Sequence, residues 1–250
     1  MSNTIKAELE LAKTKMFEEV KFNDRILVKL TRDNVAIAEA MMRNDSAYLR
    51  SMEKGAAPVG KKYGGSSAYW MTQLKKYLID HRVDGKYSYV DIIKGAVESV
   101  DRENSTHLNA DKCGRQEIIK RLYEFNKERL LECLKNPDDM DLFNEISKIT
   151  SASKGARKNV SFASKFCHYA CFYIYEDTEY QDNYSIYDSI LKKVLPMYLE
   201  YYKVNHYRKR DLEDYCKYRK AVDEIRKASK KEISRNGFDH LLWYYHKGRM

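Results

Sequence analysis

One lysine lies in an unusually apolar segment of the chain. Residues 160–175, VSFASKFCHYACFYIY, contain Lys165 as the single Lys, Arg, Asp or Glu, although 33% of the whole chain is charged. On a helix, Lys165 shares its face with Phe162, His168 and Tyr169. Two interpretations are open. In the first, the side chain extends its amine to the surface. In the second, burial lowers the pKa of the amine, which is then neutral and able to attack carbon.

A carboxylate with possible chemical use follows 23 residues later, at Asp188. Ser185 precedes an apolar run, so we expect it to be a helix N-cap with Asp188 at the third helical position. That role is a sufficient structural explanation. It is also compatible with catalysis, because a helix N-terminus keeps a carboxylate ionised and an ionised carboxylate stabilises a developing sugar cation. A helix, a turn and the start of the next helix can bring positions 165 and 188 together.

The segment before this helix, SASKGARKN at 151–159, is small, polar and basic. Its backbone amides, with Lys154, Arg157 and Lys158 around Gly155, are suited to hold a DNA phosphate. A plain flexible loop is the alternative explanation of the same composition.

The elements that position these residues are expected to be helices, which makes the fold all-α. The chain has 10 Gly and 3 Pro, and this scarcity favours long helices joined by short links. Four of the glycines lie in 55–67, the clearest loop, and Ser66 or Ser67 at its end caps a helix with Trp70, Leu74 and Leu78. Apolar spacing and capping signals predict further helices over 3–20, 31–53 with a break at 44–46, 88–100, 115–135, 139–149, 160–175, 186–202, 206–235 and the aromatic C-terminal end.

The charge balance favours a polyanionic partner. The formal net charge is +9, and a basic surface attracts nucleic acid through long-range fields and counterion release. An anionic membrane surface or an acidic protein would fit the same charge. No apolar stretch reaches the roughly 18 residues of a membrane span, and the polar start lacks a signal core. We therefore expect no membrane partner and a cytoplasmic location.

Five cysteines at irregular spacing favour reduced thiols over disulfides or an iron–sulfur site. Cys167 and Cys171 lie four residues apart on one expected helix. Core packing is the favoured interpretation of this pair, and a metal pair is the alternative. We expect no metal site.

The residues around Lys165 and Asp188 resemble the helix-hairpin-helix DNA glycosylases, in particular the 8-oxoguanine glycosylase lineage. The resemblance runs through ARKNVSFASKFCHY and SIYDSILKKVL, where Lys165 matches the catalytic lysine of the family and Asp188 its catalytic aspartate. The closing FDHLLWYYHKG looks like the C-terminal helix of small prokaryotic relatives. The resemblance covers about residues 140–250. The hairpin here has one glycine, Gly155, where the family has two.

The resemblance implies a two-lobed helical architecture, with an N-terminal helical region over 1–110 and a catalytic region over 111–250 in one compact unit. It implies a monomeric enzyme that binds double-stranded DNA, flips out a modified base and excises it without a cofactor. Lys165 would be the nucleophile, with or without lyase activity, and Asp188 the electrostatic catalyst. The base would be 8-oxoguanine, or a modified cytosine in phage DNA, so that repair and antiviral defence are both open.

Large aromatic residues are weaker candidates for the base pocket. Trp70, Tyr169 and Trp243 are able to stack on a flipped base, but aromatics at helical spacing are more often core residues. Two other functions compete with the glycosylase hypothesis. One is a non-catalytic, basic, helical DNA-binding or antiviral-defence protein, and the other is a helical interaction module with no nucleic-acid role.

Overall fold

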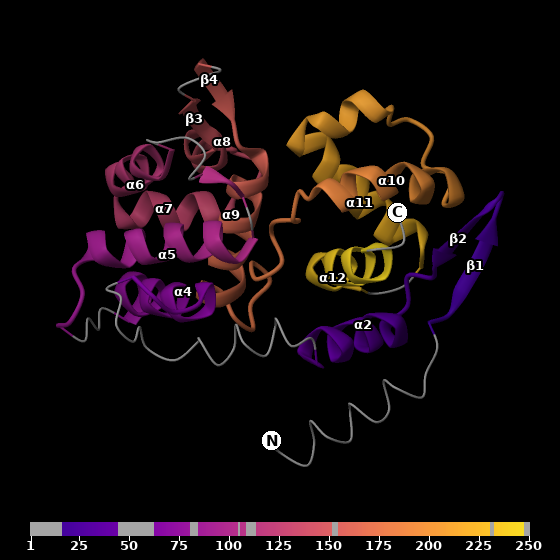
Figure 1. Cartoon of the computed structure of the whole chain (residues 1–250), viewed down its shortest axis with the longest axis horizontal. Coiled ribbons are helices and arrows are strands. Elements are labelled where there is room, and N and C mark those ends of the chain that lie inside the picture. The colour runs from indigo at the N-terminus through magenta and orange to yellow at the C-terminus, as the bar shows by residue number, and fades with distance from the viewer. Residues whose placement is uncertain are drawn as a thin grey trace, which may run out of the picture. The chain divides into compact units, whose positions relative to one another are not determined.

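The computed structural model describes residues 17–44, 63–80, 85–104, 106–108, 114–151, 155–230 and 233–247. These residues are mostly helical, with two small antiparallel sheets, so the expected all-α class is confirmed at the level of helix content (Figure 1). The chain divides into two compact units. Unit 1 comprises Met1–Leu49 and Tyr187–Met250, and unit 2 comprises Arg50–Ile186. The division expected at 110/111 therefore falls inside unit 2, and both chain ends belong to unit 1.

Unit 2 is built around one central helix. Helix α9 (Val160–Ile174) packs against α4, α5, α7 and α8. A helix surrounded by other helices is apolar on all sides, which explains why 160–175 carries so little charge. The other elements of the unit are α4 (Ser67–Lys75), the π-helix η1 (Lys76–Asp80), α5 (Tyr89–Asn104), α6 (Gly114–Glu124), α7 (Lys127–Lys135), α8 (Asp141–Ser147), β3 (Lys148–Ser151) and β4 (Gly155–Lys158).

Side-chain caps set the start of several helices in unit 2. The Ser66 hydroxyl accepts from the backbone amide of Tyr69 (3.1 Å), as expected from the sequence. Ser88 and Asp91 form the expected capping box, in which each side chain accepts from the other residue's amide (3.2 Å each). The helix predicted over 115–135 is instead two helices. Asn126 caps α7 by accepting from Arg129 N (2.8 Å), because an Asn side chain competes with the backbone inside a helix.

The core of unit 2 depends on a close approach between α4 and α5. Trp70 is fully buried and its indole NH donates to the Gly64 carbonyl (2.8 Å). The ring lies so close to Gly95 that a Cβ there would be 2.1 Å from a ring atom. Apolar side chains of α9, including Phe162 and Phe166, are fully buried in the same unit. A side chain larger than hydrogen at position 95 would therefore separate the two helices.

The segment expected as a basic loop is a β-hairpin. Strands β3 and β4 pair antiparallel, with Lys148 opposite Lys158 and Ile149 opposite Arg157. The helix predicted over 139–149 is correspondingly shorter, since β3 begins at Lys148. Gly155 opens β4 with φ +65°, a left-handed conformation that glycine adopts without strain. The hairpin follows α8 directly and contacts α6 (Figure 1).

Unit 1 joins the two ends of the chain. Helix α12 (Arg235–His246) packs against α2 (Arg32–Asn44), α10 (Ser189–Tyr201) and α11 (Tyr215–Ala228). The buried Tyr198 hydroxyl of α10 accepts from Val28 N (3.2 Å) and bonds His246 Nε2 (3.0 Å), which ties a strand to two helices. The remaining elements are β1 (Glu19–Phe22), β2 (Arg25–Val28) and the 3₁₀ helix η3 (Lys209–Glu213).

The N-terminal helix predicted over 3–20 lies largely outside the described residues. Its last four positions are described and the prediction is wrong there, because 17–18 are not helical and Glu19 and Val20 belong to β1. The strands turn at Asn23, whose φ of 52° suits the left-handed conformation that asparagine tolerates. Helix α2 confirms the helix expected from 31, while 45–53 is not described.

Candidate active site at the carboxyl end of α5

Lys165 lies in the second turn of α9 and is buried. The helix begins at Val160, five residues before Lys165. Asn159 caps it, because its side chain accepts from Phe162 N (3.0 Å). Only 6% of Lys165 is exposed. The structure thus favours the buried interpretation of this lysine over the one in which its side chain extends into water.

The amine of Lys165 lies at the carboxyl end of α5. Its Nζ donates to the backbone carbonyl of Asn104, the last residue of that helix, at 3.4 Å. The Tyr169 hydroxyl, one turn further along α9, donates to Asn104 Oδ1 (3.1 Å). Helix carboxyl ends carry partial negative charge and attract cations. The position therefore offers the amine a structural role as well as a chemical one.

A polar network holds the chain in place just after α5. The carboxylate of Asp101, which is 4% exposed, accepts from the hydroxyl of Thr106 and the amide of Leu108. It also pairs with Arg115 at 2.7 Å. Asn159, the cap of α9, donates from Nδ2 to the Thr106 carbonyl (2.9 Å). We call the set Asp101, Asn104, Thr106, Arg115 and Lys165 the α5 end.

The neighbours of Lys165 on α9 are structural. The Nδ1–H of His168 donates to the Tyr184 carbonyl (2.8 Å), which ties the segment after α9 to the helix. Cys167 and Cys171 are fully buried and free of disulfides, and burial raises the pKa of both thiols. Such thiols stay protonated at neutral pH and are poor nucleophiles. The core-packing interpretation of this cysteine pair is therefore supported.

Asp188 belongs to unit 1, whereas Lys165 belongs to unit 2. The prediction that Ser185 caps the helix was wrong, because α10 begins at Ser189 and Asp188 is itself the N-cap. Its half-buried carboxylate accepts from Ile190 N (2.7 Å). Asp188 has extended backbone angles, as an N-cap requires, and an aspartate there bonds the first free amides. The carboxylate still faces the positive end of the helix dipole.

The residues expected to hold a phosphate do not share one face. Successive side chains of a strand point to opposite faces, so Arg157 lies on the face of Ile149, which is 1% exposed. Lys158 lies on the opposite face with Lys148. Gly155 is at the start of β4, and Lys154 lies outside the described residues. The hairpin therefore places Arg157 and Lys158, two residues of the predicted phosphate site, on opposite faces.

The three aromatic candidates for a base pocket are also separated. Trp70 has no exposed surface and belongs to the core. Tyr169 is half-buried and contacts the α5 end through Asn104. Trp243 lies in unit 1, where the amine of Lys247 stacks 4.1 Å from its ring centroid. Tyr169 is therefore the candidate placed beside Lys165.

Asn104 and Asp101 were not predicted as site residues. Both lie some 60 residues before Lys165 in the chain, and the contact is made by folding alone. The one available signal is the Asn-Ser-Thr sequence at 104–106, which follows the charged residues 101–103.

Comparisons with protein-family models, curated proteins and solved structures find no match to this chain. Among the described residues, no group of three or more His, Cys, Asp or Glu side chains is placed to hold a metal ion. Within the same residues, no helix is both long enough and apolar enough to cross a membrane.

Proposed function

We propose that the protein is a DNA glycosylase that excises a modified base, with Lys165 as its nucleophile. The observation that carries the proposal is the burial of this single amine within an apolar helix. Burying an amine is costly unless the position is used, and a desolvated lysine is the usual source of a nucleophilic amine in proteins. The amine would attack the anomeric carbon of a flipped nucleotide as the bond to the base breaks.

Asp188 has a separate role in this proposal. Its carboxylate, at the N-terminus of α10, would stabilise positive charge on the deoxyribose. The assignment depends on the resemblance to helix-hairpin-helix glycosylases and on the chemistry of a carboxylate that a helix dipole favours. The variants of Asp188 are therefore tested independently of those of Lys165.

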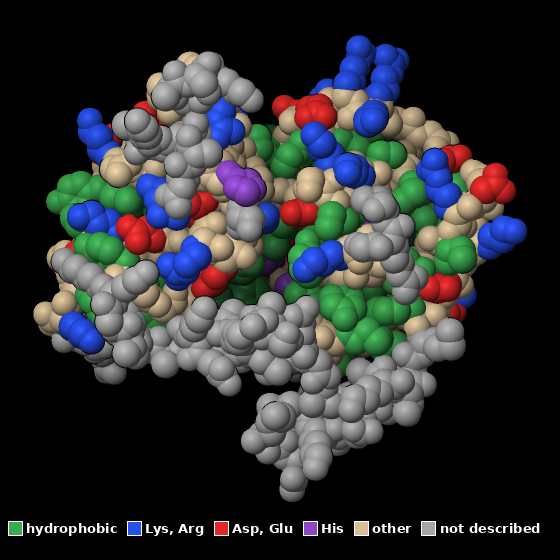
Figure 2. Space-filling model, viewed as in Figure 1, with side chains coloured by type: hydrophobic (Ala, Val, Ile, Leu, Met, Phe, Trp, Pro, Cys, Tyr) green, Lys and Arg blue, Asp and Glu red, His purple; other side chains and the backbone are tan. Residues whose placement is uncertain are grey.

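The DNA partner is supported by charge. The net charge is +9, and Figure 2 shows Lys and Arg side chains spread over the face in view and interleaved with Asp and Glu. The hairpin between α8 and α9 carries basic residues next to the helix of Lys165. We propose that this segment is the counterpart of the glycosylase hairpin and that it supplies DNA contacts through the face of β4 that carries Lys158, whereas Arg157, on the opposite face, makes none.

The test is a base-release assay on duplexes that contain 8-oxoguanine, uracil, alkylated purines, or hydroxymethylated or glucosylated cytosine. We expect release from one substrate with the wild type and none with Lys165→Ala or Asp188→Asn. Activity should survive EDTA because no metal takes part. Release from a duplex by Lys165→Ala at the wild-type rate would exclude Lys165 as the nucleophile.

Borohydride trapping tests the covalent step. A Schiff base between Lys165 and the sugar would be reduced to a stable protein–DNA adduct, whereas an active wild type that gives no adduct would act without a covalent bond. Lys165→Arg is the matched control, since it keeps a positive charge and hydrogen-bond donors but forms no such imine. We expect Lys165→Arg to bind DNA and to give no adduct.

A non-catalytic DNA-binding or antiviral-defence protein is the second candidate function. The hydrogen bond from Lys165 to the Asn104 carbonyl favours it, because the bond gives the amine a structural partner. This candidate predicts full DNA affinity with Lys165→Ala, no base release on any duplex, and a lower melting temperature for the variant.

A further inference from the structure

An open groove lies beside the β-hairpin of unit 2. It has a volume of about 600 Å³ and is bounded by α6, α7, α8 and both hairpin strands. We call it the hairpin groove. Its lining is polar and charged apart from Phe125, and comprises Arg121, Glu124, Phe125, Arg129, Asp141, Asn144, Glu145, Lys148 and Lys158. A volume of this size accommodates a phosphodiester with its flanking sugars rather than a single ion.

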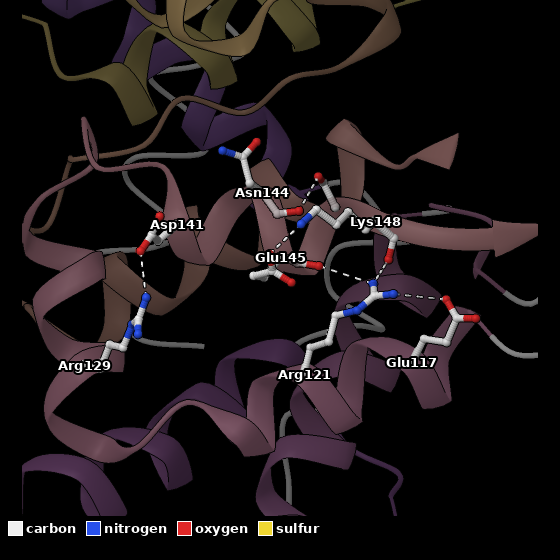
Figure 3. A network of polar contacts seen from close by, with 8 residues as sticks. Glu117, Arg121, Arg129, Asp141, Asn144, Glu145 and Lys148 are labelled. Carbon is white, nitrogen blue, oxygen red and sulfur yellow. Dashed lines mark hydrogen bonds and ion pairs between the residues drawn. The ribbon is translucent and has the colours of Figure 1, made fainter. Parts of the chain in front are cut away.

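Part of this charge holds the fold together. Arg121 donates to the carbonyls of Glu145 and Lys148, and thereby secures the end of α8 and the start of β3 against α6 (Figure 3). Its guanidinium also lies 3.5 Å from Glu117. Arg121 is therefore occupied by backbone carbonyls and is not the residue that would receive a ligand.

Other groups in the groove are held less firmly. Arg129 pairs with Asp141 at 2.7 Å, but the two side chains are 58% and 50% exposed. An exposed pair of this kind contributes little to stability, so the guanidinium can exchange its partner for a ligand. The side-chain amide of Asn144 points away from the Arg121 network in Figure 3 and has no hydrogen-bond partner among the described residues.

Lys158 is the uncompensated cation of the groove. It is exposed and makes no ion pair or hydrogen bond through its side chain to any described residue. It also lies directly opposite Lys148 in the hairpin. The amine of Lys148 pairs with Glu145, which reduces but does not remove the repulsion between like charges opposed in a strand pair. An anion between the hairpin and α8 would relieve this repulsion and satisfy both Lys158 and Asn144.

We propose that the hairpin groove binds one backbone phosphate of DNA, with Lys158 and Asn144 as the direct contacts and Arg129 as an exchangeable third. The inference rests on the proposed DNA-binding function and deepens it. Only part of the basic segment 151–159 contacts the phosphate in this inference, because Arg157 lies on the other face of the hairpin. The lining has four cationic side chains against three carboxylates. This balance suits a single monoanionic group such as a phosphodiester better than an acidic peptide that carries several carboxylates.

The experiment measures affinity for a short unmodified duplex over a range of salt concentrations. Lys158→Ala should weaken binding roughly tenfold near 100 mM salt and reduce the slope of log K against log salt by about one. Arg157→Ala removes the same charge from the adjacent position and should leave the slope nearly unchanged. Asn144→Ala removes a neutral donor, so it should lower affinity severalfold without changing the slope.

Two results would overturn the inference. One is an equal loss of slope in Lys158→Ala and Arg157→Ala, which would mean a diffuse charge effect. The other is wild-type affinity in Asn144→Ala. Melting temperatures of the three variants check that each remains folded. Failure of the glycosylase proposal is distinguishable, because it would abolish base release while the binding pattern of these variants persists.

Discussion

The α5 end and the hairpin groove belong to the same unit and both contain cations beside acidic groups, but they use them differently. At the α5 end, the side chain of Asp101 is 3% exposed and meets donors from Thr106, Leu108 and Arg115. In the hairpin groove, ion pairs such as Arg129 with Asp141 are half-exposed. Water screens the second kind of pair and hardly reaches the first. The buried set therefore fixes the fold, and the exposed set remains available to a ligand.

The largest expected effect is on the buried pair. Asp101→Asn removes the charge that compensates Arg115, whose side chain is 23% exposed. Breaking a fully buried pair costs several kcal/mol, and the partial exposure of Arg115 reduces that cost. We expect the free energy of unfolding to fall by about 2–3 kcal/mol. Asp141→Asn is the matched change in the groove and should cost much less, because its partner Arg129 is exposed to water. Urea unfolding of both variants measures the difference, and equal losses would contradict the contrast between the two regions.

A smaller effect separates the two roles of Lys165. If its amine is kept for chemistry, it costs stability through desolvation, and Lys165→Met should be as stable as the wild type or more stable by about 1 kcal/mol. A structural amine predicts a loss instead. Tyr169→Phe is the control, because it removes the other hydrogen bond to Asn104 and should cost about 1 kcal/mol. Thermal melting of the two variants side by side shows whether loss of the Lys165 amine raises or lowers the melting temperature.

The sequence predicted those features that depend on neighbouring residues. The cap at Ser66, the capping box of Ser88 and Asp91, and the apolar helix around Lys165 all follow from local patterns, and the structure contains them. Burial of Lys165 was also one of the two interpretations of that helix. Local patterns sufficed because α9 is central and its composition reflects contact on every side.

Features set by competition between neighbours were missed. Asn126 interrupts one predicted helix, and Asp188 takes the cap position given to Ser185. The β3–β4 hairpin was missed because β4 is small and basic, and because Lys148 and Ile149 of β3 directly follow a helical pattern and were counted with it. The pairing is stabilised by contact of β3 with α6 and α8. The partners of Lys165 could not be predicted, since Asn104 is 61 residues away in the chain.

The smallest expected effect concerns the cost of keeping a cation in the groove. Lys158→Thr removes a like charge opposite Lys148 and introduces a β-branched residue, both of which favour a strand pair. We expect a gain of about 0.5 kcal/mol at low ionic strength, because salt screens exposed charges. The gain should shrink at high salt, and the same variant should lose DNA affinity. Unfolding measured at both salt concentrations tests this. A variant that is less stable than the wild type would show that Lys158 serves the fold and not a ligand, and would place the hairpin groove with the α5 end as a structural site.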